Sequence, residues 1–202
     1  MIPRYEFRAF AQNFAAAAER LRGLARCDEI SESKEVYFVT TSSGDHNVKV
    51  RDDSLDVKQL VGRRQDLEQW KPVFQESFPM TADPVRETLC PVLGIGEPNL
   101  DRTEYSLEQL VSEVVRPCPN VAVVHVFKRR FRFTLGHCPA EIDELLVNGA
   151  AIQSLAIESE AGESVLAAVR DLGVVDYENV NYPRALRRIL GLEPWPADTW
   201  WL

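Results

Sequence analysis

The stretch Val124–Thr134, VHVFKRRFRFT, decides the fold that the sequence predicts. With the two-residue period of a β-strand, Lys128, Arg130 and Arg132 fall on one face. The opposite face carries three aromatic residues and two polar interruptions: Phe127, Phe131, Phe133, His125 and Arg129. Because an aromatic face is buried most favourably in a core, the basic face must point either into bulk water or into a polar cavity. Whether the basic face points into water or into a cavity determines what the protein binds.

Length and composition fit one globular domain. The 202 residues include 45% hydrophobic and 27% charged side chains. No apolar run approaches the roughly 20 residues of a membrane-spanning helix, and no signal-like segment is found, so we expect a cytoplasmic protein. The net charge of −8 argues against a nucleic acid or a membrane surface as partner. Since no flexible linker is present, we expect a single domain over 1–202, with a Trp-rich tail at 193–202.

Other segments alternate in the same way. In residues 2–10, Arg4, Glu6 and Arg8 share one face, and Tyr5 and Phe7 share the other. Further strands are expected at Glu35–Thr41, Asn47–Arg51, Leu55–Val61, 66–78, Ala140–Val147 and Ser154–Glu160. Turn-rich stretches and an Asn-Gly pair at 148–149 separate them, which indicates a meander of hairpins.

Apolar residues at helical spacing predict amphipathic helices that cover a core. The helical segments expected are 11–26, 83–90, 106–115, 163–172 and 183–190. Ser106 and Gln109 form a capping-box pattern, and Gly173 and Gly191 follow the last two segments.

The charged strand faces favour a closed sheet. On any single strand, charges on one face usually mean a face in water. With seven or more strands, however, a sheet tends to curl or close, and its charged faces then line an enclosed space. We therefore expect an α+β fold, a closed or nearly closed antiparallel β-barrel (tunnel) with its apolar face outward beneath flanking helices.

The order of these elements resembles the CYTH family, the triphosphate tunnel metalloenzymes. Lys49-Val50-Arg51 stands at the place of the family's R-x-R motif, Lys58 at its lone lysine, and Lys128-Arg129-Arg130 at its K-x-R strand. Asp143 matches the acidic strand, and Glu158-Ser159-Glu160 matches E-x-E most nearly. The resemblance spans nearly the whole chain through short motifs, so the expected domain is CYTH-like.

The resemblance implies binding, and metal-dependent hydrolysis, of a triphosphate-containing ligand such as inorganic triphosphate, thiamine triphosphate or a nucleotide. The residues it implies for the phosphates are Arg8, Lys49, Arg51, Lys58, Lys128, Arg130 and Arg132. The residues it implies for Mg²⁺ or Mn²⁺ are Glu6, Asp143, Glu158 and Glu160, and no separate catalytic residue is assigned.

One departure favours a second hypothesis. Where the family has E-x-E-x-K, this chain has Glu6-Phe7-Arg8-Ala9-Phe10, so a cation replaces one carboxylate and an aromatic residue replaces the lysine. An arginine beside a Mg²⁺ site adds repulsion. The alternative is therefore a non-catalytic tunnel that binds a phosphorylated ligand or a partner after losing the metal site.

Two features admit other interpretations. Glu158 and Glu160 have the residue types of a glycosidase acid/base pair, although nothing else suggests sugar binding. Trp195, Trp200 and Trp201 could pack on the body, plug a tunnel mouth or form a homodimer contact. The four cysteines lie far apart and are expected to be reduced thiols.

Overall fold

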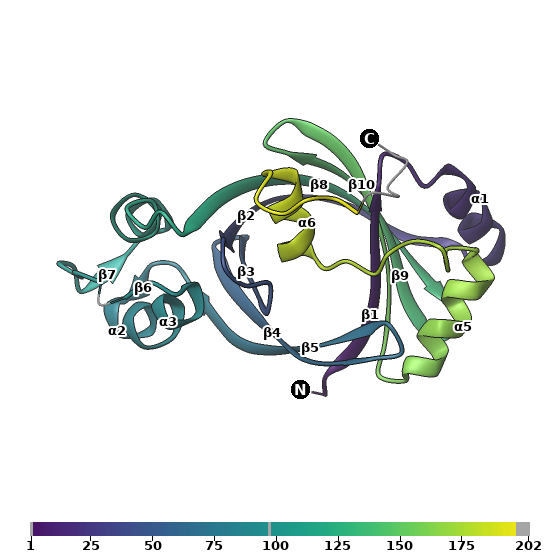
Figure 1. Cartoon of the computed structure of the whole chain (residues 1–202), viewed down its shortest axis with the longest axis horizontal. Coiled ribbons are helices and arrows are strands. Elements are labelled where there is room, and N and C mark those ends of the chain that lie inside the picture. The colour runs from purple at the N-terminus through teal and green to yellow at the C-terminus, as the bar shows by residue number, and fades with distance from the viewer. Residues whose placement is uncertain (1, 97, 197–202) are drawn as a thin grey trace.

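The computed structural model describes residues 2–96 and 98–196, and these form a closed antiparallel β-barrel with helices around it (Figure 1). Around the barrel the strands follow the order β1-β10-β9-β8-β2-β3-β4-β5, and β5 pairs back with β1. Their bounds are β1 Arg4–Ala11, β2 Cys27–Thr40, β3 His46–Arg51, β4 Ser54–Arg64, β5 Leu67–Ser77, β8 Val121–Leu135, β9 Cys138–Val147 and β10 Ala150–Ser159. The closed barrel expected from the strand faces is confirmed.

The long strand β8 lies between β2 and β9, with Lys128 opposite Ser33 on one side and Leu145 on the other. Its alternation is as expected, because Lys128 and Arg130 are buried inward while Phe133 is buried in the outer core. The two polar residues that interrupt the aromatic face, His125 and Arg129, are exposed. The strand thus separates an inner charged surface from an outer apolar one.

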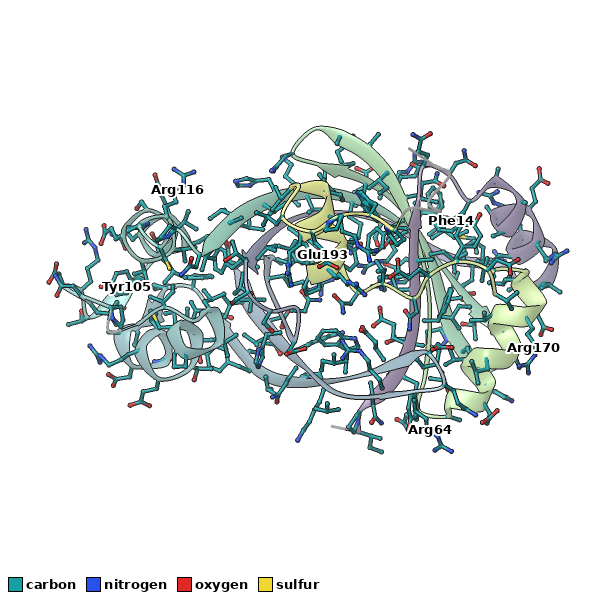
Figure 2. All side chains as sticks on the ribbon, in the orientation of Figure 1. Phe14, Arg64, Tyr105, Arg116, Arg170 and Glu193 are labelled. Atoms are coloured by element: carbon teal, nitrogen blue, oxygen red, sulfur yellow. The ribbon has the colours of Figure 1, made fainter. Side chains whose placement is uncertain are left out.

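One outer layer consists of helices α1, Ala15–Leu24, and α5, Gly162–Leu172, which pack on β1, β9 and β10. Outward residues of these strands, such as Phe7 and Ile142, form a core with Leu21 and Phe14. Figure 2 labels Phe14 beside α1. The left-handed residue Gly173, with φ of +68°, ends α5 as its position predicted.

A second outer layer covers β2, β3 and β4. It contains β6 Met80–Thr81, α2 Ala82–Pro84, η1 Val85–Leu89, α3 Cys90–Leu93, β7 Glu104–Tyr105, α4 Leu107–Gln109 and η2 Leu110–Val115. Leu89 and Leu110 pack here against outward residues such as Val48 and Val57. The expected capping box is present, because the backbone N–H of Gln109 donates to Ser106 and the Gln109 side chain accepts from the backbone N–H of Ser106.

Helix α6, Tyr182–Ile189, does not cover the outside but lies across one end of the barrel (Figure 1). Its Ala185 and Leu186 pack among inward residues of the strands, including Val124, Val126 and Leu145. The inner surface is therefore apolar at the α6 end and charged farther along. The expectation that the whole apolar face points outward needs this correction, because the barrel end is filled by a helix and not by water.

Strand β2 is longer than the sequence indicated, since it begins at Cys27 and not at Glu35. Residues 28–34 contain a single large apolar side chain, Ile30, which is 56% exposed, so they lack the apolar alternation that marks a covered strand. Among the described residues, no helix is both long and apolar enough to cross a membrane. Trp200 and Trp201, and with them most of the proposed tail contact, lie outside the described residues.

Candidate ligand-binding site

A cavity of about 470 Å³ occupies the charged part of the barrel interior. Cations and acids both line it, and the charged residues of its lining are Glu6, Arg8, Lys49, Arg51, Asp56, Lys58, Lys128, Arg130, Glu141 and Glu158. Its size falls within the usual range for small-molecule pockets, roughly 300–1,000 Å³. Lys128 and Arg130 of the basic strand face therefore point into a polar cavity and not into bulk water.

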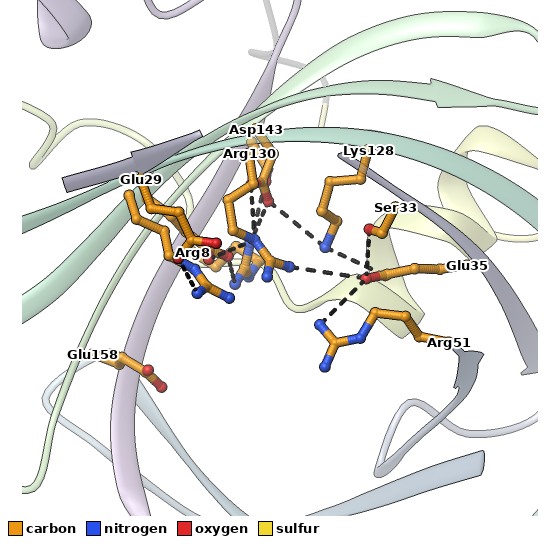
Figure 3. A network of polar contacts seen from close by, with 12 residues as sticks. Arg8, Glu29, Ser33, Glu35, Arg51, Lys128, Arg130, Asp143 and Glu158 are labelled. Atoms are coloured by element: carbon orange, nitrogen blue, oxygen red, sulfur yellow. Dashed lines mark hydrogen bonds and ion pairs between the residues drawn. The ribbon is translucent and has the colours of Figure 1, made fainter. Parts of the chain in front are cut away.

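The basic half of this cavity is arranged around one carboxylate. We define this half as Lys49, Arg51, Lys58, Lys128 and Arg130 together with Glu35. Glu35 is 1% exposed, and Arg51, Lys128 and Arg130 point toward it in Figure 3. The distances from its carboxylate oxygens are 3.4 Å to Lys128 Nζ, 3.9 Å to Lys49 Nζ, 3.9 Å to Arg130 Nη2 and 4.0 Å to Arg51 Nη1.

None of these cations hydrogen bonds to Glu35. Its oxygens instead accept from the Tyr37 hydroxyl at 2.6 Å and from Ser33 Oγ at 3.3 Å. Within the part of the chain that the structure describes, Lys49, Lys58 and Lys128 donate no side-chain hydrogen bond, and Lys58 has no ion pair. The basic half thus presents N–H groups that are charged and not yet used.

Burial and neighbouring charges shift the pKa values of Glu35 and Lys49 in this half. Burial alone would raise the pKa of Glu35, but Lys128, Lys49 and the Tyr37 hydroxyl outweigh it and lower the pKa to about 2. Burial, with Lys128 and Arg51 nearby, lowers the pKa of Lys49 to about 8, although Glu35 acts in the opposite direction. Glu35 therefore stays ionised at neutral pH, and Lys49 loses its proton at a pH only slightly above neutral.

The acidic half is arranged the other way, with one cation among acids. We define it as Glu6, Glu141 and Asp143 together with Arg8 and Ser154. Arg8 Nε donates to Glu6 Oε1 at 2.6 Å and Arg8 Nη2 donates to Glu141 Oε1 at 2.8 Å. Arg8 Nη1 donates to Ser154 Oγ at 3.1 Å and lies 3.6 Å from Asp143 Oδ2.

These contacts stabilise the charged forms of Arg8 and Glu141. Burial would lower the pKa of Arg8, but Glu6 and Glu141 hold it well above its ordinary value. Burial likewise opposes ionisation of Glu141, yet Arg8 and Arg130 keep the pKa of that carboxyl well below its usual range. Burial and the neighbouring Glu141 raise the pKa of Asp143. Every N–H-bearing nitrogen of the Arg8 side chain is committed to a hydrogen bond in this half.

The aromatic ring of Tyr182, from α6, lies between the two halves. Arg8 Cζ is 4.7 Å and Lys128 Nζ is 4.4 Å from its ring centroid, within cation–π distance. The ring stacks on Tyr37 at 5.3 Å, and its hydroxyl donates to Asp143 Oδ2 at 3.2 Å. Helix α6 therefore supplies the aromatic floor of the cavity.

The acidic half does not fit a divalent metal ion. Mg²⁺ requires oxygen ligands at about 2.0–2.1 Å in a near-octahedral arrangement. Here the Arg8 guanidinium stands among the carboxylates that would supply those oxygens. Among the described residues, moreover, no group of three or more His, Cys, Asp or Glu is placed to hold a metal ion. The cation that these carboxylates bind is an arginine of the chain itself.

The structure brings most of the expected site residues together. Nine of them line or adjoin the cavity: Glu6, Arg8, Lys49, Arg51, Lys58, Lys128, Arg130, Asp143 and Glu158. Glu158 stands apart from the Arg8 contacts and pairs at 3.1 Å with Arg4 (Figure 3). Arg132 is exposed and pairs with Glu29 at 2.7 Å, and the exposed Glu160 follows the end of β10 at Ser159.

Two buried acids were missed by sequence reasoning. Glu35 was assigned only to a strand, although its alternation with Tyr37 places both on the inner face. Glu68 is 8% exposed and accepts hydrogen bonds from Asn181 at 2.9 and 3.0 Å and from Trp70 at 3.1 Å. The alternation Glu68, Trp70, Pro72 in β5 could have indicated it, but the neighbouring Asn181 comes from far along the chain.

Comparison with known proteins supports the fold. No family model matches the chain, and no curated protein matches it in sequence. A conserved hypothetical protein from Pyrococcus furiosus superposes with a TM-score of 0.53 at 15% identity, covering 88% of this chain and 98% of its own. A putative adenylyl cyclase from Hippeastrum, described as having a dominant triphosphatase activity, superposes with a TM-score of 0.51 at 13% identity, covering 97% and 99%. The chain has the fold of these proteins.

Proposed function

We propose that the protein binds a small ligand carrying a triphosphate group, at the basic half of the cavity and without a divalent metal ion. The observation that carries this proposal is the set of five inward cations whose N–H groups are not hydrogen bonded to Glu35. An enclosed set of unused cationic donors is what a polyanion requires.

The residue types suit phosphate oxygens. Arg51 and Arg130 offer planar guanidinium groups that bind two oxygens at once, whereas Lys49, Lys58 and Lys128 act as point charges. They come from β3, β4 and β8, which lie on the arc β8-β2-β3-β4 of the barrel, so they would line one side of a bound ligand. The fold shared with the Hippeastrum protein, which is described as a triphosphatase, also supports a triphosphate ligand.

Hydrolysis is not part of the proposal. The acids available to hold a metal ion are already bound to Arg8 at 2.6 and 2.8 Å, and displacing this buried guanidinium would leave its charge uncompensated. Arg8 therefore favours the non-catalytic alternative that the sequence left open, in which an internal cation replaces the metal.

Calorimetry with tripolyphosphate, thiamine triphosphate and ATP tests the proposal. We expect at least one of them to bind with an affinity that changes less than about twofold between EDTA and excess Mg²⁺ or Mn²⁺, because no metal bridges ligand and protein. Lys58→Met should weaken binding about tenfold, by analogy with the loss of one close charge pair. The matched control is Lys71→Met, an exposed lysine of β5.

Three outcomes would contradict the proposal. No binding of any triphosphate would remove it entirely. Binding that appears only with Mg²⁺ or Mn²⁺ would show that a metal ion displaces Arg8. Metal-dependent release of phosphate would make the protein a hydrolase.

A further inference from the structure

Glu35 is an unexpected residue to find within an anion site. It is the most buried residue of the basic half, together with Lys128, and both are fully enclosed in the barrel wall and floor. Four cations of the site lie within 4.0 Å of its oxygens. The negative charge of a carboxylate in this place cancels part of the positive potential that would otherwise act on a ligand.

An acid–base role does not account for this carboxylate. A general base works best with a pKa near the operating pH. The cations around Glu35 lower its pKa to about 2, so it remains negatively charged at neutral pH. Its hydrogen bonds from Tyr37 and Ser33 also fix its position.

The cations of the basic half differ in how closely Glu35 approaches them. Lys128 is the nearest at 3.4 Å, Arg51 is at 4.0 Å, and Lys58 has no ion pair among the described residues. A ligand with one phosphate group at Lys128 shares its cation with Glu35 and meets the repulsion of that carboxylate. A longer ligand also reaches Arg51 and Lys58, where Glu35 competes less.

We infer that Glu35 is a specificity-determining residue, which excludes ligands with a single phosphate group and admits those with two or more linked phosphates. This inference rests on the proposed function and adds the rule by which the site selects its ligand. The Glu35 carboxylate competes with the ligand for the cations of the basic half. The charge of a monophosphate is too small to overcome this competition. It is not a catalytic residue, because it acts through the cations that it holds.

Affinities for orthophosphate, pyrophosphate and tripolyphosphate, measured without metal, test this selection. The wild-type protein should prefer tripolyphosphate to orthophosphate by about 1,000-fold or more, given that each close charge pair contributes about tenfold. Glu35→Gln keeps an acceptor for Tyr37 and removes the charge, so it should reduce that ratio at least about tenfold through tighter orthophosphate binding. Glu35→Asp retains the charge and should keep the ratio within about threefold.

Glu68→Gln is the matched control. Glu68 is a buried carboxylate of the same barrel, but its partners are Asn181, Trp70 and Arg63, and none of these belongs to the basic half. Its neutralisation should leave the ratio unchanged. An equal effect of both Gln variants would overturn the inference, because it would reflect total charge and not position.

The inference and the proposed function fail in different ways. If the wild-type protein binds no tripolyphosphate, the proposed function fails. If it binds tripolyphosphate but Glu35→Gln keeps the wild-type ratio, only the role of Glu35 is wrong. If circular dichroism shows that Glu35→Gln does not fold, the wild-type protein decides: a tripolyphosphate-to-orthophosphate ratio below about tenfold overturns the inference, since one further phosphate contact alone supplies that much.

Discussion

In the acidic half of the cavity one cation, Arg8, is surrounded by acids, whereas in the basic half one acid, Glu35, is surrounded by cations. Arg8 hydrogen bonds to its partners at 2.6–3.1 Å. The cations around Glu35 lie 3.4–4.0 Å away and make no hydrogen bond to it. The two halves therefore differ in more than the sign of their charge, because the cations of the basic half keep donors that Glu35 does not engage.

The largest effect is expected where the halves meet. Lys128 Nζ lies 3.4 Å from Glu35 and 3.7 Å from Asp143, and the side chain is 2% exposed. Lys128→Met leaves two buried carboxylates without this cation, so we expect a loss of about 3–5 kcal/mol in the free energy of unfolding. For a chain of this length that corresponds to a fall in Tm of roughly 10 °C.

Thermal unfolding and tripolyphosphate calorimetry check this prediction together. Lys34→Met, on an exposed position of β2, is the control. A variant as stable as the wild type would show that the two halves are independent and that Lys128 is not shared between them.

The next effect concerns the acidic half alone. Arg8→Gln removes the cation that hydrogen bonds to Glu6 and Glu141, while Arg130 remains 3.1 Å from Glu141 and 3.4 Å from Asp143. Because clustered carboxylates are relieved by a divalent cation, we expect Mn²⁺ to bind the variant at least about tenfold more tightly than the wild type. Electron paramagnetic resonance of free Mn²⁺ measures this directly, and Mn²⁺ should also raise the Tm of the variant.

Arg4→Gln is the control for this experiment, since Arg4 lies on the same strand and pairs with Glu158 but is half-exposed. If wild-type protein and Arg8→Gln bind Mn²⁺ equally, then Arg8 does not compete with a metal ion. The acidic half would then not be blocked by its own arginine.

A smaller effect is expected from pH in the basic half. The pKa of Lys49 is lowered to about 8 by burial and by the cations around it. Its ammonium group is present below that pH and is lost above it, so affinity for tripolyphosphate should fall about tenfold between roughly pH 7 and 9. In Lys49→Arg the charge persists, and the fall should disappear in calorimetry. An identical pH profile in both proteins would assign the change to the ligand itself.

The smallest effect is expected at the exposed end of β8. Arg132 pairs with Glu29 and is far more exposed than Arg130. Exposed ion pairs contribute little, so Arg132→Gln should change tripolyphosphate affinity less than about twofold at physiological salt. A tenfold loss in the same calorimetric titration would add Arg132 to the ligand-binding residues, as the sequence resemblance implied.

The sequence predicted the parts of this arrangement that depend on local alternation. The spacing of Lys128 and Arg130, like that of Glu6 and Arg8, identified inward positions, and all four residues line the cavity. These inferences succeeded because a strand fixes the side of each residue, and closure of the barrel then fixes what faces inward.

The rest depended on contacts between distant segments. Nothing near Glu35 in the sequence indicates that Lys49, Lys128 and Arg130 converge on it from two other strands. Helix α6 was expected to cover a core like the other amphipathic helices, and only the assembled barrel shows that Leu186 packs at the barrel end. Alternation along a strand specifies which residues share a face of the sheet, but not whether a helix packs on the outer or the inner face.

The position of α6 has a further consequence for how a ligand enters and leaves the barrel. With one end of the barrel filled by side chains of this helix, a ligand would not enter or leave at that end. A polymer of phosphates would then not thread through the barrel from end to end. Short ligands, and the free ends of long ones, are the shapes that suit a barrel with one filled end.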